Sequence, residues 1–211
     1  MPDSLRDRIV DAASDKFLRD GFSSVTTDEI AADLGISKKT LYQHFDSKKN
    51  LLESVIDRFT HEVELQVKGI TLDNSLEFTA KIELMLMLIA RRLSRIRQPL
   101  IKDIRRSAPE LWDRIQKFRK KHIISRFEEL ISEGIVNGEI RDDLDPTLLM
   151  LILTRLFDSV LTPEVLADIP YSTNEVFSAV MDTFFAGILS PKGIEKYKTK
   201  HQSEKPNSGV K

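Results

Sequence analysis

Side chains that donate hydrogen bonds are concentrated on one side of a short helix expected over residues 38–44. Leu41 and Phe45 lie four positions apart, so they share one helical face and are expected to pack inward. The other side chains then point outward: Lys38, Lys39, Thr40, Tyr42, Gln43 and His44. Lysine donates to guanine edges or to phosphates, and glutamine pairs bidentately with adenine. The outward set therefore predicts a surface that binds double-stranded DNA.

The residues just before this helix predict a second helix and a tight turn that position it. Thr26 and Glu29 have the spacing of a capping box, which starts a helix, and Gly35 after Leu34 can take the left-handed conformation that ends one. Ser37 is suited to cap the next helix. Two helices separated by about one turn of chain are typical of a helix-turn-helix.

A third helix is expected to begin directly after this pair. Ser47 can cap it, and Lys48 and Lys49 occupy its first turn. A helix N-terminus and two ammonium groups can meet the same phosphate, which favours contact with a duplex backbone.

The whole stretch resembles the DNA-binding segment of the TetR family of bacterial transcriptional regulators. The residues that match are Thr26-Thr27, Ile30-Ala31, Leu34-Gly35-Ile36-Ser37, Thr40-Leu41-Tyr42, His44-Phe45 and Lys48. The pattern and the resemblance together assign ten residues to DNA contact: Thr26, Thr27, Ser37, Lys38, Lys39, Thr40, Tyr42, Gln43, His44 and Lys48.

The resemblance implies an all-α chain with two domains. A three-helix helix-turn-helix domain is expected over residues 1–50, and a larger helical domain for ligand binding and dimerisation over residues 51–190. A polar, disordered tail is expected over residues 191–211. Within the first domain, Leu5, Ile9, Ala13 and Phe17 form the apolar stripe of a bracing helix over residues 4–20, which Gly21 ends.

Composition favours a soluble protein of the cytoplasm. The 211 residues include no cysteine, and hydrophobic and charged residues make up 41% and 31%. No apolar run approaches the roughly 20 residues needed to cross a bilayer, and the N-terminus lacks the pattern of a signal peptide. Residues 1–50 hold eight Lys/Arg and nine Asp/Glu, so a general basic stripe is missing and the lysines are local.

Catalytic and cofactor signatures are absent from the sequence. It contains no phosphate-binding loop, no dinucleotide-binding glycine motif, no nucleophile elbow and no zinc-protease motif, so neither an enzyme nor a cofactor is expected. His61 and Glu64 are three positions apart, so on a helix their side chains could ligate one metal ion. Such a pair more often lies on a solvated helix face, and no metal site is expected. Several arginines follow the core helix over residues 82–90 and fit either an anionic ligand or a solvated helix end: Arg91, Arg92, Arg95 and Arg97.

Two groups of apolar residues in the second half are assigned from the helices that carry them. The first is expected to line a pocket for a small hydrophobic or amphipathic ligand: Met85, Leu88, Phe118, Phe127, Met150 and Phe157. The last two long helices are expected to form a homodimer interface, and the residues assigned to it lie on the final helix: Val176, Phe177, Val180, Phe184 and Ile188.

The sequence therefore predicts a regulator of transcription that binds a palindromic operator as a dimer, because one short helix reads few base pairs. The expected mode is repression that a small molecule relieves. The alternative is a helix-turn-helix protein that a protein partner controls.

Overall fold

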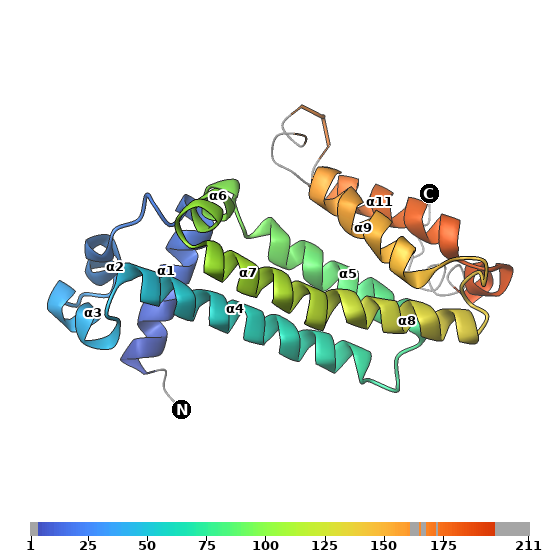
Figure 1. Ribbon diagram of the computed structural model, residues 1–211, viewed down its shortest axis with the longest axis horizontal. Coiled ribbons are helices and arrows are strands. Elements are labelled where there is room, and N and C mark those ends of the chain that lie inside the picture. Colours follow the sequence, from blue (N-terminus) through green and yellow to red (C-terminus); the bar gives the residue numbers. More distant parts are fainter. Residues whose placement is uncertain (1–3, 161–164, 166–167, 172, 197–211) are drawn as a thin grey trace, which may run out of the picture. The chain divides into compact units, whose positions relative to one another are not determined.

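The computed structural model describes residues 4–160, 165, 168–171 and 173–196, and they are almost entirely helical (Figure 1). Over these residues one isolated bridge, between Ile140 and Leu189, is the extent of β-structure. The all-α prediction is confirmed. In chain order the elements are α1 (Leu5–Asp20), α2 (Thr27–Asp33), α3 (Lys38–His44), α4 (Lys48–Thr71), α5 (Phe78–Ser94), α6 (Gln98–Ser107), α7 (Pro109–Phe118), the π-helix η1 (Arg119–Ile124), α8 (Ser125–Val136), α9 (Pro146–Val160) and α11 (Thr173–Ile188).

The chain forms two compact units, and each draws on two segments of sequence. Unit 1 comprises the residues up to 69 together with residues 88–122, and unit 2 comprises residues 70–87 together with those from 123 onward. Helix α5 therefore contributes its first half to unit 2 and its second half to unit 1. The functional division at residue 50 remains a prediction.

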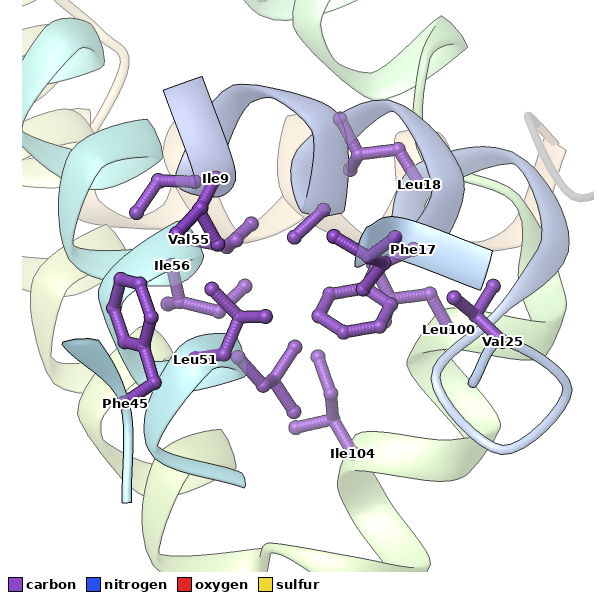
Figure 2. Close-up of a cluster of buried hydrophobic side chains, with 14 of the residues drawn as sticks. Ile9, Phe17, Leu18, Val25, Phe45, Leu51, Val55, Ile56, Leu100 and Ile104 are labelled. Atoms are coloured by element: carbon purple, nitrogen blue, oxygen red, sulfur yellow. The ribbon is translucent and has the colours of Figure 1, made fainter. Parts of the chain in front are cut away.

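The hydrophobic core of unit 1 holds helices α2 and α3 in place (Figure 2). Ile9, Ala13 and Phe17 of α1 are buried as the four-residue period predicts. Leu41 of α3 and Phe45 pack in the same cluster, with further side chains from α4, α6 and α7: Leu51, Leu52, Val55, Ile56, Leu100, Ile104, Ala108 and Leu111. Burying apolar side chains is the main favourable term in folding, so this cluster fixes the orientation of α3.

Helix α1 covers nearly the predicted range, with Ser4 as its N-cap and Gly21 after its last residue. The Ser4 hydroxyl accepts from the Asp7 N–H at 3.2 Å, and Gly21 follows the last turn with a φ of 87°. A side chain at Gly21 would meet Pro99, because a Cβ there would lie 2.8 Å from the proline Cβ. The Arg97 N–H also donates to the Leu18 carbonyl at 3.1 Å. The start of α6 is thus tied closely to the end of α1.

The chain is continuously helical from Pro109 through α7, η1 and α8 to Val136, but its winding changes over η1. His122 lies in this wider turn, stacks on Phe118 with 5.0 Å between ring centroids, and places Nδ1 3.2 Å from Glu64 Oε1. Glu64 also forms an ion pair with Lys68 at 2.8 Å.

The C-terminal tail departs from expectation over its first six residues. Residues 191–196 are helical, and the Gly193 N–H donates to the Ser190 hydroxyl at 3.1 Å. Lys196 donates to Glu139 at 2.7 Å, and Glu139 is only 4% exposed. The prediction of disorder was wrong here because the polar side chains find partners on the loop after α8. Residues 197–211 lie outside the described residues.

Candidate nucleic-acid interface

Helix α2 starts at a complete capping box. The Glu29 N–H donates to the Thr26 hydroxyl at 3.2 Å, and the Thr26 N–H donates to Glu29 Oε2 at 2.7 Å. That backbone hydrogen bond lowers the pKa of the Glu29 carboxyl. Thr26 is exposed. The residue that caps α2 is therefore also accessible, as its assignment to DNA contact requires.

The turn between α2 and α3 has the predicted form. Gly35 has a φ of 64°, and the Gly35 N–H donates to the Ala32 carbonyl at 3.0 Å. Ser37 then caps α3, accepting from the Thr40 N–H at 3.0 Å. The Ser37 and Thr40 hydroxyls lie 2.8 Å apart and are exposed or partly exposed.

Helix α3 presents the predicted surface. Leu41 and Phe45 are buried, whereas Lys39, Gln43 and His44 are exposed. Lys39 and Gln43 are one turn apart, so both side chains leave the helix on the same side. An ammonium group and an amide at this spacing can donate to neighbouring base pairs in a major groove.

Thr27 departs from its assignment as a DNA contact. The residue is only 6% exposed, and its Oγ1 lies 3.3 Å from the hydroxyl of Tyr42 on α3. A buried hydroxyl does not reach a duplex, so the expectation of direct contact was wrong. Thr27 instead positions Tyr42, which is exposed on the same surface as Lys39. The resemblance misled here because it records residue types and not burial.

The three remaining lysines near α3 have different surroundings. Lys48 is partly buried, with Nζ 4.4 Å from the centroid of the Phe22 ring, and burial lowers the pKa of its ammonium group. Lys49 forms an ion pair with Glu110, which raises the pKa of Lys49. Lys38 forms an ion pair with Asp28 at 2.9 Å. Ser47 caps α4 as predicted, accepting from the Asn50 N–H at 3.0 Å.

Helix α6 anchors the loop between α1 and α2. The Ser23 N–H donates to Asp103 Oδ2 at 2.6 Å, and the Ser23 hydroxyl donates to Asp103 Oδ1 at 2.7 Å. Sequence reasoning missed this contact because its two residues are eighty positions apart and carry no motif. The loop leads directly into α2, so Asp103 helps to set where the helix-turn-helix begins.

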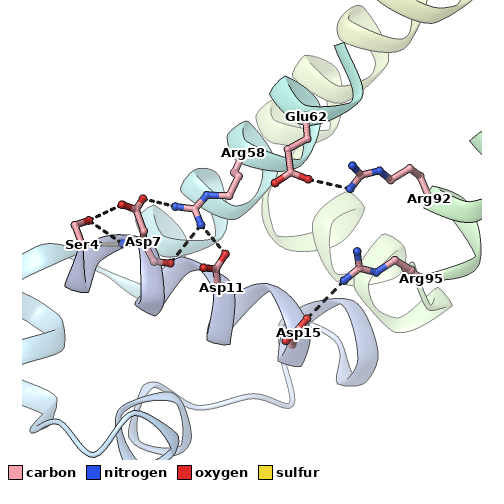
Figure 3. A network of polar contacts seen from close by, with 8 residues as sticks. All are labelled: Ser4, Asp7, Asp11, Asp15, Arg58, Glu62, Arg92 and Arg95. Carbon is pink, nitrogen blue, oxygen red and sulfur yellow. Dashed lines mark hydrogen bonds and ion pairs between the residues drawn. The ribbon is translucent and has the colours of Figure 1, made fainter. Parts of the chain in front are cut away.

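Ion pairs tie helix α1 to α4 and to Arg95, the residue directly after α5 (Figure 3). Arg58 donates to Asp7 at 2.5 Å and to Asp11 at 2.6 Å, and Arg95 lies 3.6 Å from Asp15. A further ion pair joins Arg92 of α5 to Glu62 of α4 at 2.9 Å. Arg92 and Arg95 thus bind carboxylates of this chain, and the alternative of an anionic ligand for these two arginines is not favoured.

The residues assigned to a ligand pocket are not brought together in one described cavity. Met85, Phe127 and Met150 are buried in unit 2, Leu88 and Phe118 are partly buried in unit 1, and the side chain of Phe157 lies outside the described residues. The five described residues of this set do not line the groove found in unit 2. Their role in ligand binding stays a prediction.

That groove, of about 950 Å³, lies between α9 and α11. Four of the five residues assigned to dimerisation line it, namely Val176, Val180, Phe184 and Ile188, while the side chain of Phe177 lies outside the described residues. Val176 and Ile188 are buried within the unit, and Val180 and Phe184 are partly exposed. The sequence assigned the α9 helix to dimerisation but did not identify the apolar residues that it exposes in and beside the groove: Leu148, Leu151, Ile152 and Leu156.

Comparison with known proteins identifies the class. Residues 9–55 match the family model described as bacterial regulatory proteins, tetR family. The HTH-type transcriptional regulator YvaF of Bacillus subtilis (strain 168) is 27% identical over 170 residues, which cover 81% of this chain and 88% of YvaF. The Fatty acid metabolism regulator protein of the same organism is 24% identical over 186 residues, covering 86% of this chain and 94% of that protein.

Solved structures share the fold. A transcriptional regulator from Saccharomonospora viridis, crystallised in complex with choline, aligns with a TM-score of 0.76 at 21% identity, over 88% of this chain and 97% of that one. The match over residues 9–55 and these relatives together support a DNA-binding transcriptional regulator of the TetR type.

Other site types find no support in the described part of the chain. It holds no group of three or more histidine or acidic residues placed to bind a metal ion. None of its helices is long and apolar enough to cross a membrane.

Proposed function

We propose that the protein is a cytoplasmic repressor that binds a palindromic operator as a homodimer and is released by a small molecule. The observation that carries the DNA-binding part is the exposed side of α3, where Lys39 and Gln43 stand one turn apart above the buried Leu41 and Phe45. A rigid core beneath the helix keeps these side chains ready for base contacts.

Exposed apolar surface supports the dimer. Leu148, Leu151 and Ile152 of α9 are roughly half-exposed, next to the apolar groove between α9 and α11. Monomeric proteins rarely leave contiguous apolar surface of this kind in water. A second copy with the same helices covers it, and a two-fold interface presents two α3 helices to half-sites about 34–36 Å apart.

Relatives support a small-molecule effector. One is named for the regulation of fatty acid metabolism, and another protein of the same fold was crystallised with choline. We infer a small hydrophobic or amphipathic ligand for this chain. Such a ligand acts only through its difference in affinity for two dimer conformations, which typically amounts to about 1–3 kcal/mol of coupling.

Selection of bound sequences from random duplex DNA tests the proposal. The expected result is an inverted repeat whose half-sites are separated by about one helical turn or a multiple of it. A non-repeated or sequence-independent result would contradict palindromic recognition. Thermal-shift screening against fatty acids and quaternary amines then tests the effector. Failure of every compound in the screen to stabilise the protein would favour control by a protein partner.

A further inference from the structure

Lys38 stands at the DNA-facing surface but its charge is already paired. Its Nζ donates to Asp28 Oδ2 at 2.9 Å, and the two side chains are 54% and 63% exposed. The hydrogen bond from Lys38 to Asp28 raises the pKa of the ammonium group. Lys38 is the first residue of α3 and Asp28 lies in the first turn of α2, so the ion pair joins the two helices at the surface that was assigned to DNA.

We propose that Asp28 is a specificity-determining residue, which keeps Lys38 from contacting phosphates and so weakens binding to DNA of random sequence. This inference rests on the proposed role of α3 in the major groove. A phosphate that approaches the Lys38 ammonium also approaches the Asp28 carboxylate, and the two negative charges repel each other. Lys39, the next residue, has no ion-pair partner among the described residues and remains available to DNA.

Residues 1–50 have almost no net charge, so each single lysine has a large effect on the affinity for DNA. Residues 1–50 carry eight basic and nine acidic side chains, so they have no general attraction for DNA. Phosphate contacts supply nearly all of the affinity for random sequences. A regulator that lacks one such phosphate contact therefore binds non-operator DNA more weakly, and this DNA competes less with the operator.

The size of the effect follows from counterion release. Affinity falls as salt rises, and each lysine–phosphate contact adds about 0.9 to the magnitude of the slope of log affinity against log salt. At roughly 0.15 M salt this corresponds to about 5-fold in affinity. Asp28→Asn is therefore expected to raise the affinity for a random duplex about 5-fold for each DNA-binding domain that contacts it. Operator affinity should rise less, because base contacts fix the register of α3, whereas on random DNA the protein can shift until Lys38 reaches a phosphate.

The experiment measures binding of the full-length protein to a random duplex and to the selected operator by fluorescence anisotropy over a series of salt concentrations. The variants are Asp28→Asn, Lys38→Met and the double variant. Asp33→Asn is the matched control, because Asp33 is on the same helix and pairs at 2.8 Å with Lys16 of α1, away from α3. Thermal melts verify that each variant is folded, and Asp28→Ser replaces Asp28→Asn if that variant is not.

The expected result has three parts. Asp28→Asn makes the affinity for random DNA fall more steeply with salt concentration than in the wild type. Lys38→Met alone leaves this salt dependence unchanged, and the double variant behaves like Lys38→Met. The inference is overturned if Lys38→Met alone lowers the slope by about 0.9, if Asp33→Asn has the same effect as Asp28→Asn, or if operator and random affinities rise equally. Failure of the proposed function is seen separately, because it shows in the wild-type protein as the lack of a selected palindrome.

Discussion

Replacing Ile152 with glutamate is expected to separate the dimer into monomers. Ile152 is 48% exposed on α9 and lines the groove between α9 and α11. Its exposed part is therefore available to a second copy of the chain, and the substitution changes the surface of the monomer with little effect on the buried core of unit 2.

The magnitude follows from the exposed fraction. Complete burial of an isoleucine side chain contributes about 1.5–3 kcal/mol, so the exposed half contributes roughly 1 kcal/mol per protomer to the interface. A symmetric dimer loses this twice, and two carboxylates that lose part of their hydration in the interface cost several kcal/mol more. A total above about 4 kcal/mol weakens the dimer by about a thousand-fold.

Sedimentation equilibrium over a range of protein concentrations measures the dimer dissociation constant directly. Val136→Glu is the control, because Val136 is 86% exposed at the end of α8 and does not line the groove. That control should leave the dissociation constant unchanged. If Ile152→Glu dimerises as tightly as the wild type while remaining folded by circular dichroism, the interface lies elsewhere and the reasoning is refuted.

Four further substitutions test parts of unit 1. Leu41→Ala removes a fully buried side chain and is expected to lower the free energy of unfolding by about 2–5 kcal/mol in denaturant titrations, and a loss below about 1 kcal/mol would contradict its place in the core. Gly21→Ala should lower the melting temperature, because φ is 87° and the new Cβ would lie 2.8 Å from a carbon of α6; an unchanged value would contradict that close approach. Lys39→Ala should change the bases that are selected and leave the salt slope unaltered, and equal losses on operator and random DNA would assign Lys39 to phosphate. The pKa of Glu29 is lowered in the folded state, so its contribution to stability is present at neutral pH and is lost as the pH falls below about 4.5. Glu29→Gln should therefore make the melting temperature less dependent on pH in that range. An identical pH dependence in the variant and the wild type would show that ionisation of Glu29 does not stabilise the fold.

The sequence by itself determined the local structure of the DNA-binding region. Gly21, the Thr26–Glu29 capping box, Gly35 and Ser37 all lie at or next to a helix end in the structure. These signals are reliable because a cap or a left-handed glycine acts on backbone groups within four residues. The inward direction of Leu41 and Phe45 followed from helical spacing in the same way.

Tertiary structure alone decided how the exposed charges and hydroxyls of that region are used. Asp103 binds Ser23 from a distant helix, Thr27 is buried beneath Tyr42, and Asp28 pairs with Lys38 across the turn. Such contacts depend on which side chains become neighbours when helices pack, and neither spacing nor composition records that. The residue types identified a surface that suits DNA, whereas the packing of α2, α3 and α6 determined which of its groups remain available to bind it.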